Sequence, residues 1–220
     1  MEKINIENSN RRKTFEWFKG FSNSTYSMNV RMDVTKLVKY VKENNHSFFI
    51  DLLYIVINGL NLIEEMRMRL IDDEPILFEK INPAFTVMTK TNTFENVRFE
   101  YVDDYLTFYK IASKKIEEAK NQTQIKKEEY NPENVYNEYY ITCVPWVDFT
   151  EFNHPIPDDK CSQCIPRICW GKYIENNGKY ELTLNITVSH IFVDGYPLSK
   201  AFNNLQNSLN NVENILKKSN

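Results

Sequence analysis

The stretch from Leu182 to Leu198, LTLNITVSHIFVDGYPL, places a histidine where an alternating strand turns into a loop. Apolar residues occupy every second position up to Val188, and the next position on the same face is His190. Asp194 and Gly195 follow, a carboxylate and a residue that tolerates positive φ. Because imidazole titrates near neutral pH, His190 could serve as a general acid or base. It could equally be a buried histidine with one satisfied hydrogen bond.

Cysteines offer a second possible site. Cys161 and Cys164 form a C-x-x-C pair, with Cys169 and His154 nearby. Structural zinc sites usually need a second pair at regular spacing, and this sequence lacks one. We therefore expect no metal. We expect the four cysteines to be free thiols in or near the core, as is usual in a reducing compartment.

Composition and charge exclude several classes of protein. The chain has 220 residues, of which 42% are hydrophobic and 14% aromatic, enough for a sizeable core. A net charge of −3 with scattered lysines gives no reason to expect a nucleic-acid partner. The N-terminus has no apolar signal region, and the most apolar stretch, residues 48–63, is short and interrupted by polar residues. We expect a cytoplasmic protein with no membrane partner.

Periodicity predicts the elements that must position these residues. Three- and four-residue spacing predicts helices at residues 11–21, 34–45, 48–66, 101–118 and 197–216. Alternating or β-branched segments predict strands at residues 24–35, 68–72, 76–81, 84–90, 135–146, 164–173 and 179–190. Ser47 is a candidate N-cap for the second long helix, and Asn177 with Gly178 predicts a hairpin turn. We expect an α+β fold in which residues 1–220 form a single domain.

The segment SHIFVDG contains an H-x-x-x-D-G motif that occurs in acyltransferases using coenzyme A thioesters. Further segments follow in the order found in the chloramphenicol acetyltransferase family: RRKTFEWF, STYS, MDVTKL, PAFTVM with NTF, PWVDFTEF and WGKY. The sequence resembles that family over nearly its whole length. We expect no lipoyl domain ahead of it, which separates it from dihydrolipoyl acyltransferases with the same motif.

This resemblance implies a homotrimer of α+β protomers, flanked by helices, with the active site at a subunit interface. It implies transfer of acetyl from acetyl-CoA, as co-substrate, to a hydroxyl of chloramphenicol, which inactivates the antibiotic. His190 would be the general base. The oxyanion donor of the family is a serine four residues before the tryptophan of its P-W motif, and Thr142 stands there. Its methyl could crowd the acceptor, and Thr142 could also be an ordinary strand residue.

Neighbouring positions receive roles from the same resemblance. An acyl-cysteine route through Cys143 would place it on the face opposite Thr142 unless a bulge intervenes. Asp194 would pair with Arg11 and, with Gly195, hold the turn that carries the histidine. Arg11 could equally be a solvated charge. The coenzyme A channel would be lined by Lys172, Tyr173 and Trp146.

The acceptor pocket would be formed by Trp17, Phe18, Ser22, Ser24, Phe94, Phe152, His154 and Cys169. Its aromatic rings suit a nitrophenyl ligand. Ser22, Ser24, His154 and Cys169 differ in type from the family, and Tyr130 is the nearest candidate for a further ring. Acetyl transfer is therefore better supported than the identity of the acceptor. Two alternatives stay open: a different hydroxylated acceptor, or a non-catalytic protein that binds a hydrophobic ligand.

Overall fold

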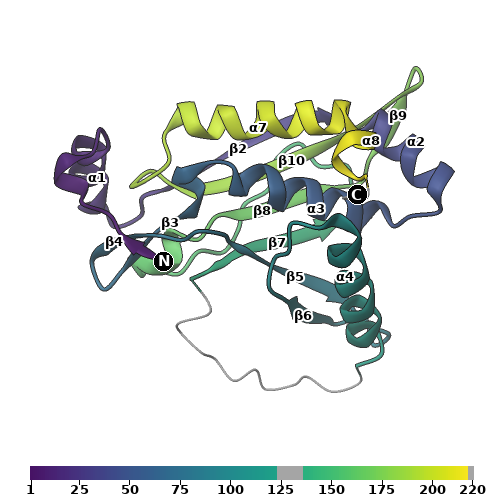
Figure 1. Cartoon of the computed structure of the whole chain (residues 1–220), viewed down its shortest axis with the longest axis horizontal. Helices are drawn as coiled ribbons and strands as arrows, with labels where there is room; N and C mark the ends of the chain where they lie inside the picture. Colours follow the sequence, from purple (N-terminus) through teal and green to yellow (C-terminus); the bar gives the residue numbers. More distant parts are fainter. Residues whose placement is uncertain (123–135, 218–220) are drawn as a thin grey trace.

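The computed structural model describes residues 1–122 and 136–217 and is built around one mixed sheet (Figure 1). The strands of this sheet are β2 (Thr25–Asp33), β5 (Asn82–Met88), β6 (Phe94–Arg98), β7 (Glu138–Val144), β8 (Arg167–Gly171), β9 (Ile174–Asn176) and β10 (Lys179–Ser189). Their order is β2-β10-β8-β7-β5-β6, with β9 paired to β10. The pairs β5–β7 and β7–β8 are parallel and the others antiparallel. A second sheet has the order β1 (Glu2–Lys3), β4 (Glu74–Leu77), β3 (Met68–Ile71).

Helices cover one face of the large sheet. The helices in the described part of the chain are α1 (Arg12–Lys19), α2 (Thr35–Asn44), α3 (Phe48–Asn61), α4 (Tyr105–Lys120), α6 (Lys160–Gln163), α7 (Gly195–Asn210) and α8 (Val212–Ile215), with short 3-10 turns η1 (Ile6–Asn8) and η2 (Glu64–Arg67). Of these, α2, α3, α4 and α7 form the layer over the large sheet, whereas α1 lies beyond its end (Figure 1). The central α3 packs against α7, α4 and α2. Gly59 allows α3 and α7 to pack close together, because a Cβ at this position would lie 2.6 Å from the Leu205 side chain of α7. The structure is thus an α+β fold whose core lies between sheet and helices.

The alternation along β10 divides its side chains between two environments. Leu182, Leu184, Ile186 and Val188 are buried in the hydrophobic core on the helix side. Thr183, Asn185, Thr187 and Ser189 point to the other face and are also buried. Asn185 Nδ2 donates hydrogen bonds to Asn29 Oδ1 at 2.9 Å and to the Phe152 carbonyl at 3.0 Å. The chain that follows β7 therefore reaches this second, polar face, where the buried Asn185 side chain is satisfied by hydrogen bonds.

The predicted elements occur in the predicted order, with a few differences. The helix predicted to reach Met66 ends at Asn61, and Glu64–Arg67 forms a 3-10 turn instead. The last helix is divided into α7 and α8 at Asn211, while β1, η1, β6, α6 and β9 were not predicted. Ser47 occupies the N-cap position of α3, as predicted, but its side chain makes no cap bond, and its backbone N–H donates to Tyr109 Oη at 2.8 Å.

Positive φ values mark the turns. Asn177 and Gly178 have φ of 52° and 80°, as the hairpin prediction requires. Gly195 is not among the residues with positive φ, so the turn after His190 does not use the freedom that glycine has in that region. Gly195 is instead the first residue of α7, capped by the Asp194 side chain.

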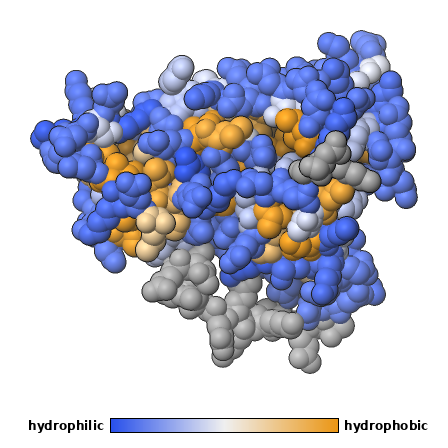
Figure 2. Space-filling model, in the orientation of Figure 1, coloured by the Kyte–Doolittle hydropathy of each residue, from blue (hydrophilic) through white to orange (hydrophobic). Residues whose placement is uncertain are grey.

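The surface shown in Figure 2 is mostly hydrophilic. On the face shown in Figure 2, hydrophilic residues cover most of the surface and hydrophobic areas are separated from one another. Across residues 1–122 and 136–217, helices are too short or too polar to cross a membrane.

All four cysteines are free; Cys164 and Cys169 are buried, and Cys143 and Cys161 half-buried. In the same part of the chain, no three His, Cys, Asp or Glu side chains form a group that could hold a metal ion.

Candidate active site

His190 stands in the turn directly after β10, in a position fixed by two aromatic rings. Its backbone N–H donates to the Ser24 carbonyl at 2.8 Å, which ties the turn to the start of β2. The imidazole stacks on Phe18, with centroids 3.8 Å apart and planes 15° from parallel, and lies 5.0 Å from the Tyr26 ring. Nδ1 is buried and has no hydrogen-bond partner among the described residues. The ring is therefore held rigidly through its faces.

A charged cluster holds the same turn from behind. Arg11 Nη1 contacts Asp194 Oδ2, and Arg11 Nη2 lies 2.7 Å from Glu65 Oε1. The Arg11 side chain is only 17% exposed, so it is not a solvated surface charge. Asp194 Oδ1 accepts the Tyr196 N–H at 3.1 Å and caps α7. Asp194 thus connects the histidine turn, α7 and the N-terminal segment. Sequence reasoning missed Glu65, which shows no local pattern toward Arg11.

Thr142 lies on the face of the sheet that the helices do not cover. It pairs with Cys169 of β8, which pairs with Asn185 of β10. Cross-strand partners share a face, so Thr142 lies on the polar face with Asn185. Its neighbour Cys143 pairs with Trp170 and points to the helix side, as strict alternation requires.

The structure does not bring Thr142 and His190 together within one chain. His190 follows Asn185 by five residues, which corresponds to about 16 Å along a strand, and Thr142 lies two strands further across the sheet. A site that used both residues would need a second copy of the chain.

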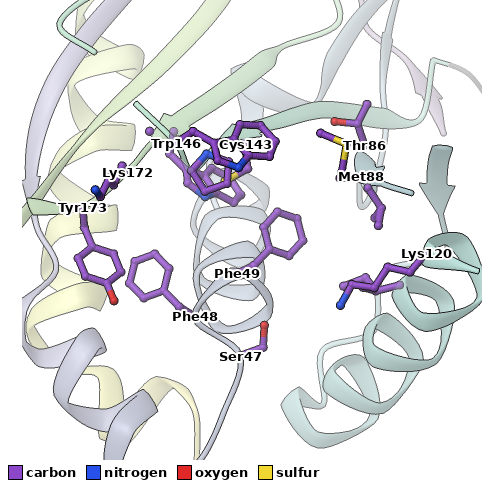
Figure 3. A pocket seen from close by; sticks show the side chains of 15 residues that line it. Ser47, Phe48, Phe49, Thr86, Met88, Lys120, Cys143, Trp146, Lys172 and Tyr173 are labelled. Carbon is purple, nitrogen blue, oxygen red and sulfur yellow. The ribbon is translucent and has the colours of Figure 1, made fainter. Parts of the chain in front are cut away.

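A cavity of about 640 Å³ opens at the ends of β5, β7 and β8, next to the start of α3 (Figure 3). All three residues predicted for the coenzyme A channel, Trp146, Lys172 and Tyr173, line it. Figure 3 shows Lys120 of α4 on the side opposite Lys172. Gly171 allows the backbone at Val147 to lie close to the end of β8, because a Cβ at position 171 would be 2.8 Å from the Val147 carbonyl oxygen.

Cys143 also lines this cavity, and its chemistry can be assessed directly. Burial raises the pKa of its thiol to about 12. The thiol is therefore protonated at neutral pH, whereas the nucleophile of an acyl-cysteine route is a thiolate. The environment of Cys143 does not support that route.

The residues predicted for the acceptor pocket fall into two groups. Near His190, Trp17 stacks on Phe18 at 5.7 Å, and Ser24 Oγ lies 2.8 Å from Ser189 Oγ. Ser22 is exposed nearby and offers its carbonyl to Gln163 Nε2 at 3.0 Å.

The second group lies with Thr142. Cys169 is its cross-strand neighbour, and the carbonyl of Phe152 binds Asn185 on the same face. The Phe152 ring lies 4.9 Å from the ring of His154. Phe94, on β6, is exposed and pairs with Met88 of the large cavity. Tyr130 is outside the described residues.

His154 is a polar element of this second group. Burial, assisted by the charge of Arg167, lowers its pKa to about 4, so the imidazole is neutral at neutral pH. Its Nε2 is buried without a hydrogen-bond partner in the described part of the chain. The ring borders a polar cavity of about 450 Å³, together with Ser27, Asn29 and Thr187. The odd-numbered polar residues of LTLNITVS were the available sequence signal for this face.

Comparisons with known proteins agree with this architecture. A family model described as chloramphenicol acetyltransferase matches residues 1–206. A chloramphenicol acetyltransferase from Clostridium perfringens is 31% identical over 216 residues, covering 97% of this chain and 96% of that protein. One from Escherichia coli is 29% identical over 205 residues, covering 92% and 91%. A solved chloramphenicol acetyltransferase structure has a TM-score of 0.85 at 26% identity, covering 94% of this chain and 99% of that one.

A dihydrolipoamide acetyltransferase from Azotobacter vinelandii has a TM-score of 0.66 at 15% identity, which shows a shared fold alone. The family model and the relative from Clostridium perfringens carry more, since both extend over nearly the whole chain, including the His190 turn, the Thr142 strand and the residues that line the large cavity. This chain belongs to the chloramphenicol acetyltransferase family and is an acyltransferase.

Proposed function

We propose that this protein moves an acetyl group from acetyl-CoA to a hydroxyl of chloramphenicol, in the cytoplasm and as a homotrimer of single-domain subunits. The observation that carries the proposal is the rigid imidazole of His190. Stacking on Phe18 and burial of Nδ1 leave Nε2 as the nitrogen that can meet a substrate. A fixed, neutral imidazole is the group that general-base attack by an alcohol requires.

The chemistry follows from that position. Nε2 of His190 takes the proton of the acceptor hydroxyl while its oxygen attacks the thioester carbonyl. The hydroxyl of Thr142 donates a hydrogen bond to the resulting oxyanion. Collapse of the tetrahedral intermediate breaks the C–S bond, and the imidazolium returns its proton to the departing thiolate. The products are the acetyl ester and coenzyme A.

The separation of His190 and Thr142 supports a site shared between subunits. The two residues lie at different ends and on different faces of one sheet. We propose that His190 of one subunit faces Thr142 of the next, with Asp194 and Arg11 supporting the turn. The two groups of acceptor residues would then meet at the same interface.

The large cavity is proposed to hold acetyl-CoA. Its walls combine aromatic rings of Trp146 and Tyr173 with the ammonium groups of Lys120 and Lys172. Aromatic surface suits the adenine and the pantetheine arm, and the cations suit the phosphates. Cofactor-sized ligands fit cavities of about 300–1,000 Å³, and this one has about 640 Å³.

A second candidate is acetylation of a different, more polar hydroxylated acceptor. The observation that favours it is the buried, unpartnered Nε2 of His154 beside Ser27 and Asn29. A buried polar atom without a partner favours a ligand that supplies the missing hydrogen bond.

The test is release of the coenzyme A thiol by the purified protein with acetyl-CoA and chloramphenicol, and with a panel of other alcohols. Chloramphenicol-dependent turnover by a particle three times the mass of the 26.2 kDa chain supports the leading proposal. Turnover with another alcohol alone supports the second candidate. Ligand binding without any turnover would make the protein a non-catalytic binder.

A further inference from the structure

A buried carboxylate lies behind the wall of the large cavity, outside the groups used by the proposed reaction. Asp51, in the first turn of α3, is fully buried. Its Oδ1 accepts a hydrogen bond from the Tyr105 hydroxyl at 2.6 Å, and its Oδ2 lies 3.3 Å from His46 Nδ1. Tyr105 Oη also lies 2.9 Å from His46 Nδ1. The three side chains come from α3, α4 and the connection before α3.

The distances assign the protons. Tyr105 has one hydroxyl hydrogen, and the carboxylate can only accept, so that hydrogen points to Asp51 Oδ1. The Tyr105 oxygen then accepts from His46, which places a proton on Nδ1. Burial holds the pKa of Asp51 above its ordinary value, and the bonds from Tyr105 and His46, which favour the ionised form, offset only part of that rise. A buried carboxylate held by two donors is costly to disturb.

This network connects to the cavity through the first turn of α3. Tyr109 Oη accepts the Ser47 N–H at 2.8 Å, and the Tyr109 ring lies 4.8 Å from the His46 ring. Ser47, Phe48 and Phe49 all line the cavity. The Phe48 ring lies 4.9 Å from Tyr173. The Ser47 side chain makes no capping bond. The start of α3 is therefore held by the hydrogen bond from the Ser47 N–H to Tyr109 of α4.

A further aromatic neighbour of His46 is Tyr40 of α2, whose ring meets the imidazole edge-on at 5.6 Å. Its hydroxyl is directed elsewhere and donates to the Leu216 carbonyl at 3.3 Å. Tyr40 therefore contributes packing to the network, while Asp51 and Tyr105 supply its hydrogen bonds.

We propose that Asp51, His46 and Tyr105 form a positioning network that sets the affinity for acetyl-CoA by fixing the start of α3. None of the three lines the cavity, so they act through Ser47, Phe48 and Phe49. The proposal rests on the assignment of this cavity to acetyl-CoA. It predicts an effect on binding of the co-substrate and little effect on the chemical step.

The test compares Asp51→Asn and Tyr105→Phe with a matched control, Tyr54→Phe. Tyr54 also lies on α3, its hydroxyl donates to the Asp103 carbonyl at 2.6 Å, and neither residue lines the cavity. Its ring lies 5.2 Å from that of Tyr105, a contact that phenylalanine retains. Calorimetric titration with coenzyme A gives Kd, steady-state kinetics give kcat and KM, and thermal melts give Tm. We expect Asp51→Asn and Tyr105→Phe to weaken binding about fivefold to tenfold, with kcat at saturation within about twofold. Tyr54→Phe should lower Tm comparably while its Kd stays within about twofold.

A double variant tests whether the residues act as one unit. If they do, adding His46→Leu to Asp51→Asn should weaken coenzyme A binding little beyond the single change. Additive losses, unchanged Kd in Asp51→Asn and Tyr105→Phe, or an equal loss in Tyr54→Phe would overturn the network. If Asp51→Asn does not fold, Tyr105→Phe decides. Failure of the wild-type protein to bind coenzyme A would overturn the cavity assignment and this inference together, whereas wild-type binding with unaffected variants overturns the inference alone.

Discussion

The two faces of the central sheet are both buried, but by different means. On the helix side, Leu184 and Ile186 of β10 belong to the hydrophobic core, which is held together by apolar contact. On the other side, Asn185 and Thr187 are buried beneath the chain that follows β7 and are held by hydrogen bonds. Apolar burial tolerates small shifts, whereas a buried polar group needs its particular partner. The second face therefore demands more exact placement.

The two proposed catalytic residues lie in these two different environments. His190 is fixed by aromatic stacking at the end of β10, next to α1. Thr142 belongs to the polar row that includes Cys169 and Asn185. If the two halves work together across an interface, changes in either should reduce the rate, and only changes in the supporting contacts should reduce stability.

The largest effect is expected for His190→Ala. Loss of a general base should lower kcat by about 10²–10⁴, while coenzyme A binding and Tm stay close to those of the wild type. Thiol-release kinetics with a parallel melt provide the measurement. A variant that keeps more than about a tenth of the wild-type kcat would exclude the general-base role.

Thr142→Val tests the other half of the site. Valine keeps the shape and the strand preference but removes the hydroxyl, so kcat should fall by about 10²–10³ with little change in KM for acetyl-CoA. Thr142→Ser is the matched control and should retain activity. Equal activity of the valine and threonine proteins would show that the oxyanion is stabilised elsewhere.

Neighbouring substitutions in β10 compare the two faces directly. Leu184→Ala should lower the free energy of unfolding by about 2–5 kcal/mol through a cavity in the core. Asn185→Ala should lower it by about 1–3 kcal/mol, because Asn29 and the Phe152 carbonyl lose their donor. Urea unfolding measures both. The comparison fails if the alanine at position 185 has no cost.

Asp194→Ala tests the support of the histidine turn. Arg11 keeps Glu65 as a partner, so we expect a loss of about 1–3 kcal/mol together with a reduced kcat. Glu65→Gln, which leaves the Asp194 contact in place, should cost less. An Asp194→Ala protein with unchanged Tm and full activity would show that the pair is irrelevant to the turn.

The smallest effect concerns pH. His154 has its pKa lowered from 6.5 to about 4 by burial, so the unfolded chain binds its proton first. Its contribution to stability is complete above about pH 6.5 and lost as the pH falls toward 4. We expect the free energy of unfolding to fall by about 1–2 kcal/mol over this pH range. This is less than the full pKa shift would give, because the ring is only partly buried. His154→Phe should flatten this part of the stability profile, and His46 and His190, present in both proteins, cancel in the difference.

The sequence by itself determined the α+β class, most elements, and the position of His190 at the end of a strand. Those features depend on local periodicity and on turn residues such as Asn177 and Gly178, which act within a few positions. The same locality explains the errors. Residue type indicated the N-cap position of Ser47, but the bond made there, to Tyr109, was decided by another element. Gly195 tolerates a positive φ that its place at the start of α7 does not use.

Only the tertiary structure decided which distant residues meet. Glu65 joins Arg11, Tyr105 and His46 enclose Asp51, and Thr142 lies on the face away from the helices. Apart from the short step from His46 to Asp51, these contacts join residues separated by many positions, and residue type alone does not select among the possible partners. The physical reason is that strand register and helix packing, set by the whole core, choose the partner of each buried polar group.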